Sequence, residues 1–411
     1  MKVALLGMGT VGTGVYEIIN EEKGNYFANA QDKVSIKKIL VRDINKKRNP
    51  KFDKNLMTDS FEDIINDDEI ETLIFAMGGM EPEFTFMKKA MEKKKHVITA
   101  NKAVVSEHFD TLLDLANKNN IMFLFEASVG GGIPIITSLK ETLKINRIDE
   151  IKGILNGTSN YILSKMASEG KNFDDVLKQA QDLGFAEADP SADVDGYDVS
   201  RKLAILSSIA FGSHIKDEDI YKRGIRNVSK ADMEMFENLG FVLKYLAHSK
   251  LVDDYYCASV EPVLLSSKDI MSNVNEEFNI VSIKGNIIGE LQFYGKGAGK
   301  NATANAVVGD LLYIINNGDK KDELDISRKL SNRGLEEFEG KYYIRVDVGN
   351  HDDFKSIIDM IDEVSKIKKM MVEKDKLFVI TEELSASTVN LLAEKLEKYG
   401  NSIFYARIVG K

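Results

Sequence analysis

The 411-residue sequence predicts an α/β protein of two or three domains, the first of which is built on a doubly wound parallel sheet. Three observations predict this class. Short apolar runs alternate with amphipathic stretches over residues 1–145, a glycine-rich turn follows the first run, and the chain ends in the order βαββαβ. The alternation requires crossover connections, which favour parallel strands covered by helices on both faces.

Five runs in residues 1–145 are almost entirely apolar, as strands covered on both faces must be. The predicted strands are residues 3–6, 36–41, 72–76, 96–99 and 121–125. The intervening stretches have helical periodicity and predict helices at 10–20, 60–66, 81–94 and 106–118. We expect these elements to form one domain, to which a helix at 303–316 returns within a segment of about 300–316.

The pattern changes after Ile145, and residues 146–300 are expected to form an α+β substrate-binding or dimerisation domain with an antiparallel sheet. Its predicted strands are 148–155, 255–263, 280–283 and 287–293, and its predicted helices are 159–168, 173–183 and 196–211. Lys284, Gly285 and Asn286 have the chemistry of a hairpin turn between the last two strands.

The C-terminal part begins with a charged stretch, residues 317–340, which is predicted to be a linker because it carries little apolar periodicity. Residues 341–411 then predict a ferredoxin-like βαββαβ domain. Its predicted strands are 342–348, 367–372, 377–381 and 402–408, and its predicted helices are 353–365 and 385–398.

Composition excludes several classes of protein. The net charge of −10 disfavours nonspecific nucleic-acid binding, so no nucleic-acid partner is expected. Cys257 is the only cysteine, which excludes an intramolecular disulfide and cysteine-based zinc sites. No apolar run is long enough to span a bilayer, and Gly7 interrupts the first run, which argues against a signal peptide. A cytoplasmic protein without membrane contact is predicted.

The strongest local signal is a G-x-G-x-x-G turn between the first strand and the first helix. It consists of Gly7, Met8, Gly9, Thr10, Val11 and Gly12. The first glycine permits a tight turn, the second lets the backbone approach a pyrophosphate, and the third allows close packing of helix on strand. The helix N-terminus favours the anion. The turn predicts a Rossmann dinucleotide-binding domain, with a purely structural turn as the alternative.

The end of the second strand is where the ribose of the adenosine should be recognised. Arg42 and the following Lys46, Lys47 and Arg48 favour NADP(H), because an arginine accommodates a 2′-phosphate. Asp43 keeps NAD(H) possible, since an acidic residue selects the free 2′-hydroxyl. A solvated basic loop is the remaining alternative.

Two further segments lie where ligands bind in this fold, at the carboxyl ends of parallel strands. Lys102 follows the fourth strand and can hold a carbonyl or alcohol oxygen by its charge, although a surface lysine is the competing interpretation. The loop 125–134 contains three glycines and exposes carbonyl oxygens, which hard cations require as ligands. From composition alone, a flexible crossover hinge explains that loop better.

An acidic segment at 184–202 enters an apolar helix. Asp195, Asp198 and Lys202 have the spacing of one helix face, which is typical of a salt-bridged surface. Against that interpretation, Lys202 opens the apolar stretch 203–206 and is a candidate for burial, where its pKa would fall. The carboxylates there could hold the ammonium group of a substrate.

These segments together resemble homoserine dehydrogenases over residues 1–316. The resemblance rests on GMGTVG at 7–12, TANKA at 99–103, FEASVGGGIPII at 125–136, GILNGTSNYIL at 153–163, GFAEADPSADVDGYDVSRKLAIL at 184–206, and the returning segments at 295–299 and 304–311. The tail resembles an ACT regulatory domain. No aspartate-kinase region precedes the first strand, so the chain resembles the monofunctional form of the family.

The resemblance implies NAD(P)H-dependent interconversion of L-aspartate 4-semialdehyde and L-homoserine, in the biosynthesis of threonine, methionine and isoleucine. It implies proton transfer by Lys202 and an essential role for Lys102, with Glu187 and Asp198 holding the substrate amino group and Asp193 supporting them. Met8, Thr10, Val11 and Arg42 would contact the cofactor, and Gly184, Glu187 and Gly299 would border its nicotinamide. Main-chain oxygens of Glu126, Val129, Gly131 and Ile133 would bind sodium. A homo-oligomer, dimer or tetramer, is implied.

The chain departs from the family pattern at two places. Ala302 stands where the family commonly has proline. The turn after the first strand of the tail, residues 349–353, lacks the usual Pro-Gly pair of an effector site, which puts threonine regulation in doubt. Two other readings stay open: a nonenzymatic NAD(P)H sensor, and a dehydrogenase acting on another aldehyde or alcohol. The acidic segment with Lys202 argues against the sensor, which needs no ammonium pocket.

Overall fold

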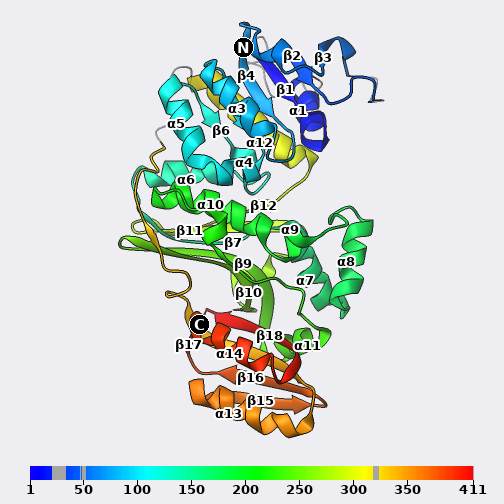
Figure 1. The fold of residues 1–411 in the computed structure, drawn as a ribbon, viewed down its shortest axis with the longest axis vertical. Helices are drawn as coiled ribbons and strands as arrows, with labels where there is room; N and C mark the ends of the chain where they lie inside the picture. The colour runs from blue at the N-terminus through cyan, green and yellow to red at the C-terminus, as the bar shows by residue number, and fades with distance from the viewer. Residues whose placement is uncertain (21–33, 47, 49–51, 318–323, 411) are drawn as a thin grey trace.

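The structure, a computed structural model, describes residues 1–20, 34–46, 48, 52–317 and 324–410. Three regions follow one another along the long axis of the molecule (Figure 1). The N-terminal parallel sheet lies at one end, a mainly antiparallel sheet with its helices lies in the middle, and the C-terminal strands and helices lie at the other end.

The first sheet is parallel and has the strand order β3-β2-β1-β4-β5-β6, which confirms the predicted doubly wound class. Its strands are β1 (Lys2–Leu6), β2 (Ser35–Leu40), β3 (Met57–Thr58), β4 (Ile70–Phe75), β5 (His96–Thr99) and β6 (Phe123–Leu124). Leu5 of β1 pairs with Ile39 on one side and Ile74 on the other. The order reverses at β1, and this reversal opens the crevice in which such folds bind ligands.

Helices cover both faces of this sheet (Figure 1). They are α1 (Thr10–Asn20), α2 (Glu62–Ile65), α3 (Glu83–Glu92), α4 (Lys102–Glu107), α5 (Phe109–Asn119) and the late helix α12 (Lys300–Asn317). α12 packs against α1 so closely that a Cβ on Gly14 would lie 2.8 Å from the Cβ of Ala304. The late segment therefore completes the core of the first region, together with Val307 and Leu311.

The second sheet runs from the middle of the molecule into its C-terminal end, in the order β12-β11-β7-β9-β10-β18-β14-β16-β15. The middle strands are β7 (Ile148–Ile154), β8 (Tyr221–Lys222), β9 (Phe241–Val252), β10 (Tyr255–Ser266), β11 (Phe278–Gly285) and β12 (Gly289–Lys296). The middle helices are α6 (Ile135–Leu143), α7 (Gly157–Glu169), α8 (Phe173–Asp182), α9 (Ser191–Val194), α10 (Tyr197–Phe211) and α11 (Lys230–Leu239).

The C-terminal region has the predicted order βαββαβ, and its strands lie in the ferredoxin-like order β18-β14-β16-β15. Its elements are β14 (Glu339–Val348), α13 (Phe354–Val364), β15 (Ile367–Glu373), β16 (Lys376–Thr381), β17 (Leu384–Ser385), α14 (Ala386–Leu396) and β18 (Gly400–Val409). β18 pairs in parallel with β10, through Val263 and Arg407 among others, so the tail continues the middle sheet.

Several elements of the structure were not predicted, among them α4, α6, α11 and the twelve-residue strand β9. Three further expectations also differ from the structure. The hairpin turn lies beyond Lys284, because Gly285 still pairs with Gly289, and Gly289 supplies the left-handed φ of 75° that the turn requires. Asp195 does not lie on the helix of Lys202, because it ends α9 and Gly196 separates it from α10.

The third of these differences concerns the predicted linker, of which residues 318–323 lie outside the described residues. β13 (Ser331–Asn332) pairs with β10, and Leu335 and Phe338 are buried against the tail. These contacts are long-range, so the local periodicity that sequence reasoning uses does not show them.

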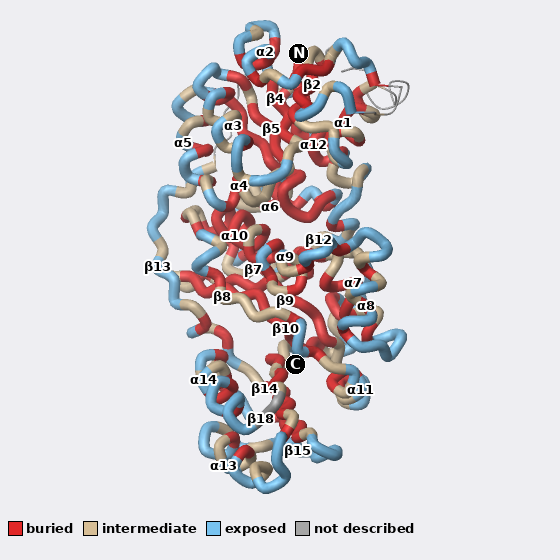
Figure 2. Tube along the Cα trace, turned by 45° about the vertical axis from the view of Figure 1, so that its right-hand side comes forward, coloured by how far each residue is buried: buried red, intermediate tan, exposed pale blue. Residues whose placement is uncertain are grey.

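Buried residues concentrate in the two sheets and in α10, as Figure 2 shows. Tyr343, Phe378 and Phe404 of the tail belong to the same apolar cluster as the middle region. Among the described residues, no helix is both long and apolar enough to cross a membrane.

Candidate functional site

The glycine turn has the geometry that a dinucleotide requires. Gly7 has a φ of 105°, and a Cβ there would lie 2.5 Å from the carbonyl oxygen of Ala76. A Cβ on Gly12 would lie 2.0 Å from the carbonyl oxygen of Gly7, so helix and strand approach as closely as the motif predicts. Nothing lies within 4 Å of a Cβ on Gly9, which leaves that face open to a ligand.

A cavity of about 290 Å³ joins this turn to both predicted catalytic lysines. Its walls include Thr10 and Val11 from the start of α1, Lys102, Lys202 and Gly299. The first region, the helix α10 and the returning segment before α12 therefore meet at one hollow. The structure brings together residues that are separated by almost three hundred positions in the sequence.

Lys102 is placed by the end of β5 and the start of α4. Asn101 is the N-cap of α4, and its side-chain oxygen accepts hydrogen bonds from the backbone nitrogens of Ala103 (3.1 Å) and Val104 (3.4 Å). The amide nitrogen of Asn101 donates to the carbonyl oxygen of Gly79 at 2.7 Å. Lys102 is thus the first residue of a capped helix, and its side chain remains 39% exposed toward the cavity side.

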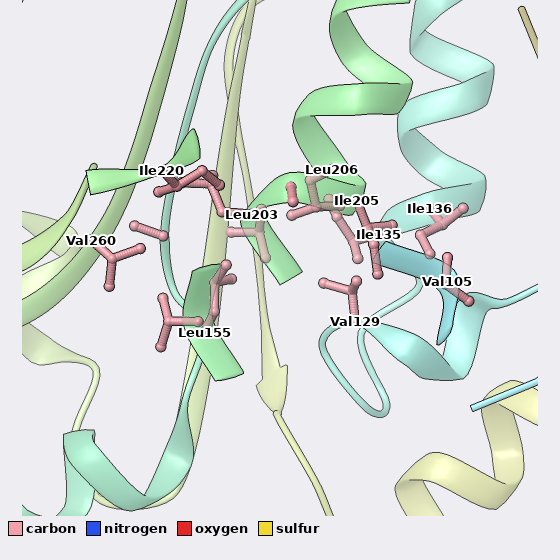
Figure 3. Close-up of a cluster of buried hydrophobic side chains, with 14 of the residues drawn as sticks. Val105, Val129, Ile135, Ile136, Leu155, Leu203, Ile205, Leu206, Ile220 and Val260 are labelled. Atoms are coloured by element: carbon pink, nitrogen blue, oxygen red, sulfur yellow. The ribbon is translucent and has the colours of Figure 1, made fainter. Parts of the chain in front are cut away.

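Lys202 is buried on α10, a helix whose apolar side chains pack in the middle of the molecule. Figure 3 shows Leu203, Ile205 and Leu206 of α10 among the side chains of neighbouring elements. Those labelled neighbours are Val105, Val129, Ile135, Ile136, Leu155, Ile220 and Val260. This packing fixes the helix, and with it Lys202, which lines the cavity, and Asp198, one turn earlier on the same helix.

Asp198 links the two lysines. Its Oδ1 lies 2.9 Å from the Nζ of Lys102, and its Oδ2 lies 2.6 Å from the Nζ of Lys202. Lys202 also donates to the carbonyl oxygen of Leu155 at 2.7 Å. Asp198 and Lys202 are four residues apart on α10, as predicted, but they form a buried pair and not a solvated surface pair.

The pKa values of Lys202, Lys102 and Asp198 are shifted in different directions. Burial lowers the pKa of Lys202, and the nearby Lys102 adds to this effect, while the attraction of Asp198 only partly opposes it. The charge of Asp198 raises the pKa of the less buried Lys102. Burial alone would raise the pKa of Asp198, but the two lysines more than offset it and the pKa falls below its usual range. The arrangement is an ionised carboxylate between two lysines, of which Lys202 releases its proton more readily.

Asn156 completes the polar cluster and was missed by sequence reasoning. Its amide nitrogen donates to Asp198 at 2.9 Å and to Asp193 at 2.7 Å. Its side-chain oxygen caps α7 through the backbone nitrogen of Ser159. Its place between β7 and a predicted helix was a capping signal, but nothing local shows that its nitrogen reaches two carboxylates. Burial raises the pKa of Asp193.

Other predicted residues lie outside this cluster. Glu187 and Gly184 are exposed in the segment between α8 and α9, and the carbonyl oxygen of Glu187 accepts a hydrogen bond from Gln181. Arg42 is exposed at the end of β2, Arg48 donates to the carbonyl oxygen of Asp43, and Lys47 lies outside the described residues. Met8 is half-buried and does not line the cavity.

The predicted cation loop lies against the same cavity. Gly130 and Gly131 have positive φ values of 73° and 54°, and Gly131 packs against the backbone of Gly297. In the described part of the chain, the carbonyl oxygens of Val129 and Gly131 accept no backbone hydrogen bond. The carbonyl oxygens of Glu126 and Ile133 accept one each. A set of main-chain oxygens of this kind fits a hard cation such as sodium.

Side-chain ligands for a metal are not grouped here. No cluster of three or more His, Cys, Asp or Glu side chains in the described residues could hold a metal ion. The carboxylate of Glu126 has another task, because it accepts hydrogen bonds from the backbone nitrogens of Ile136 and Thr137, both at 2.8 Å, at the start of α6.

Two family models match the chain. Residues 7–126 match the model described as homoserine dehydrogenase, NAD binding domain, and residues 134–312 match the model described as homoserine dehydrogenase. The two matches cover the glycine turn, both lysines and the returning helix as far as residue 312.

Relatives and solved structures agree with these matches. The homoserine dehydrogenases of Synechocystis sp. and Bacillus subtilis are 43% and 41% identical to this chain, and each match covers 77% of this chain and 73% of the relative. The crystal structure of a homoserine dehydrogenase from Thiobacillus denitrificans is similar over 100% of this chain and 98% of that one, with 32% identity and a TM-score of 0.87. A homoserine dehydrogenase structure from S. aureus is similar with 33% identity and a TM-score of 0.79, over 100% of this chain and 99% of that one.

Proposed function

The chain belongs to the homoserine dehydrogenase family, and from that premise we propose how its own residues carry the reaction. It is an oxidoreductase that interconverts L-homoserine and L-aspartate 4-semialdehyde with a nicotinamide cofactor. The observation that carries the proposal is the carboxylate of Asp198 between the amino groups of Lys102 and Lys202, two lysines that line one cavity together with the start of α1.

Lys202 is proposed to transfer the proton at the substrate oxygen. A bound nicotinamide supplies or accepts the hydride. Reduction of the aldehyde creates negative charge on its oxygen, and homoserine oxidation requires that the hydroxyl lose its proton. Lys202 suits both directions, because burial lowers its pKa and the Leu155 carbonyl oxygen and Asp198 hold its Nζ in place.

Lys102 is proposed to stabilise the same oxygen by charge. The raised pKa of Lys102 keeps its amino group protonated. Its partly exposed side chain lines the cavity, as the buried Lys202 does, and both amino groups contact the carboxylate of Asp198. A fixed positive charge in a site that excludes water is worth more than the same charge in solution. Asp198 holds the two lysines in a common position.

The substrate's ammonium group is proposed to bind the carboxylates around Asn156. Asp198 already accepts bonds from two lysines and Asn156, whereas Asp193 gives one oxygen to Asn156 and its other oxygen has no hydrogen-bond partner in the described residues. Burial raises the pKa of Asp193, and the positive charge of a nearby ammonium group would oppose this effect by stabilising the ionised carboxylate. Glu187 is proposed as the second partner, on the exposed segment that borders the site.

The cofactor is proposed to be NADP(H) in preference to NAD(H). Backbone groups of Met8, Thr10 and Val11 would bind its phosphates at the start of α1, and Gly184, Glu187 and Gly299 would border its nicotinamide. Arg42 is exposed at the end of β2, where a 2′-phosphate would lie. Main-chain oxygens of Glu126, Val129, Gly131 and Ile133 are proposed to hold sodium.

The chain is proposed to act as a homodimer or a tetramer in the cytoplasm, in the biosynthesis of threonine, methionine and isoleucine. The tail is proposed to be an ACT-like regulatory domain that contributes to association. The four strands of the tail have β18 and β15 at their two edges. β18 pairs with β10 of the middle region, so β15 is the free edge of the tail and one end of the described sheet. Met370, Met371 and Val372 of β15 are 51%, 44% and 50% exposed, and such an edge is usually covered.

One assay tests the proposed function. Purified protein should reduce NADP+ or NAD+ when L-homoserine is added at high pH, and should oxidise NADPH or NADH with L-aspartate 4-semialdehyde. Absence of turnover with either cofactor, in a folded preparation that binds the cofactor, would contradict the proposed chemistry.

A further inference from the structure

Asn279 of β11 is a buried side chain whose capacity for hydrogen bonding is unused. The residue is 0% exposed, and neither its amide nitrogen nor its amide oxygen has a hydrogen-bond partner in the described residues. In that part of the chain it is the one buried side chain with two such unpaired atoms. Buried amides are almost always paired, because an unpaired group has lost its hydration without replacement. The stability of the fold therefore does not explain an asparagine here, and such exceptions are typical of functional sites.

The amide of Asn279 lies directly against the segment 297–299, which connects β12 to α12. A Cβ on Gly297 would lie 2.1 Å from both Cγ and Nδ2 of Asn279, so no side chain fits at that position. The φ of Gly297 is not in the left-handed region, so the backbone conformation does not itself require glycine. Close contact with Asn279 is what requires it.

The segment 297–299 has unpaired groups of its own beside this amide. Within the described chain, the peptide groups of Gly297 and Ala298 form no backbone hydrogen bond. The donor and the acceptor of Asn279 therefore touch a stretch of backbone that also has donors and acceptors to offer. A small shift of the segment would pair the two sets.

The same segment forms part of the candidate active site. Residues 297–299 line its cavity together with both lysines. The segment also packs on the predicted cation loop, because a Cβ on Gly131 would lie 2.6 Å from the carbonyl carbon and oxygen of Gly297. The backbone nitrogen of Gly132 donates to the carbonyl oxygen of Lys296 at 3.0 Å. The position of the segment therefore sets the shape of this wall of the cavity.

A neighbouring strand connects Asn279 to the proton-transfer lysine. Ile280, which follows Asn279, pairs with Ile154 at the end of β7. The next residue of that strand's chain is Leu155, whose carbonyl oxygen accepts a hydrogen bond from Lys202 at 2.7 Å. Asn279 thus lies where the chain that holds Lys202 and the segment proposed to border the nicotinamide come together.

The chain just before Asn279 is held firmly. The amide nitrogen of Asn160, on α7, donates to the carbonyl oxygens of Val274 (3.1 Å), Glu276 (3.0 Å) and Phe278 (3.2 Å). Three bonds from one buried side chain fix the entry into β11. Any adjustment between Asn279 and its neighbour is therefore made by the segment 297–299.

We propose that Asn279 is a positioning residue of the dehydrogenase reaction, whose amide pairs with the backbone of the segment 297–299 in the cofactor-bound enzyme. This pairing fixes the wall beside the nicotinamide relative to Lys202. Small errors in the placement of reacting groups lower the rate strongly, so the contact matters most for the chemical step. The proposal deepens the proposed function and rests on it, but its effect on the bound cofactor is measurable without turnover.

Asn279→Leu tests the amide, because leucine has nearly the same shape and no polar atom. Removal of two unpaired atoms should leave resistance to urea unchanged or higher. In contrast, kcat for homoserine should fall about tenfold, the scale of one lost hydrogen bond, while the KM for homoserine stays within about twofold. The fluorescence emission of bound NADPH, which reports the surroundings of the reduced nicotinamide, should move toward that of free NADPH.

Ser282→Ala is the matched control on the same strand. Ser282 is buried like Asn279, but its hydroxyl is paired, donating to Glu290 at 2.6 Å. Its loss should lower resistance to urea and leave kcat and the NADPH emission unchanged. A merely structural role for Asn279 predicts that both variants behave in this way.

A double-mutant cycle tests the contact from its other side. A methyl group at position 297 overlaps the amide, so Gly297→Ala alone should lower kcat about as much as Asn279→Leu does. In the Asn279→Ala background that methyl group has room, so adding Gly297→Ala should change kcat by less than about twofold. The cycle also decides the question if Asn279→Leu does not fold.

The proposal is overturned if Asn279→Leu keeps kcat within twofold, if it lowers kcat but leaves the NADPH emission as in wild type, or if the effects of Gly297→Ala and Asn279→Ala are additive. A wild-type protein without homoserine turnover would instead contradict the proposed function. In that case the NADPH emission of the same variants still tests whether Asn279 shapes the nicotinamide site.

Discussion

At the scale of single residues, Lys202 and Lys102 share one carboxylate but have opposite pKa shifts. Lys202→Ala and Lys102→Ala are each expected to lower kcat by about 10² or more, the usual scale for a positioned proton-transfer or charge-stabilising group. Steady-state rates at saturating homoserine, with cofactor binding measured separately by fluorescence, check this. If Lys202→Ala keeps more than about half of wild-type kcat under conditions in which chemistry limits the rate, the proton-transfer role proposed for Lys202 is wrong.

We expect the choice of cofactor to depend on Arg42, which is exposed at the end of β2. If Arg42 contacts a 2′-phosphate, Arg42→Ala should weaken the binding of NADPH about tenfold or more and leave the binding of NADH nearly unchanged. The reason is that a charge-assisted contact is worth roughly 1.5–3 kcal/mol. Dissociation constants for the two reduced cofactors give the answer directly. Equal losses for both would mean that Arg42 only shapes the loop, and Asp43 would become the residue that recognises the ribose.

Glu83 makes stability depend on pH. It is buried beside Thr99, one of its carboxyl oxygens has no hydrogen-bond partner, and burial raises its pKa to about 7. The folded protein therefore retains a proton that the unfolded chain has lost, and stability falls as pH rises from the ordinary value of 4.5 to about 7. Glu83→Gln should gain up to about 3 kcal/mol relative to wild type at pH 8, and little at pH 4. Urea unfolding at both pH values tests this, and an equal difference at both would mean that folding does not raise the pKa of Glu83.

At the scale of elements, the cap of α4 connects stability with catalysis. Asn101→Ala removes the side-chain oxygen that accepts from Ala103 and Val104, so about 1 kcal/mol of stability should be lost. Because Lys102 begins this helix, kcat should fall as well. Ser385→Ala removes the cap of α14 and is the matched control, with a similar loss of stability but unchanged kcat. If both variants keep wild-type kcat, the Asn101 cap of α4 is not needed to position Lys102 for catalysis.

The same scale shows what the sequence could predict. The glycine turn, the alternation around it and the buried lysine of α10 were predictable, because strand and helix periods, glycine spacing and an apolar stretch are local signals. β9 was not, because Lys244 and His248 interrupt its apolar pattern. Both are nevertheless buried, with Lys244 donating to the carbonyl oxygen of Val274 at 2.6 Å and His248 bonded to Glu150 at 2.6 Å. Partners so distant in sequence leave no local pattern, and the same holds for Asn156 in the candidate site.

At the scale of the whole molecule, association is expected to involve the edge strand β15. Met371→Lys places a charge on this exposed edge and should shift the protein toward monomer, whereas Leu391→Lys on the exposed face of α14 should not. Sedimentation velocity over a range of concentrations measures the shift. If Met371→Lys leaves the distribution unchanged, the subunits associate elsewhere, with the other end of the sheet at β12 as the next candidate.

The parallel pairing of β10 with β18 has a consequence for how the chain reaches its native state. Synthesis completes β10 well before it reaches Arg407, the partner of Val263 in β18. Closing so long a loop is slow, and this edge of the middle sheet stays open until β18 has been made. The nascent chain thus carries an unsatisfied strand edge that invites misassembly with neighbouring chains. A nascent chain should need β18, or a chaperone in its place, to avoid such misassembly during that interval.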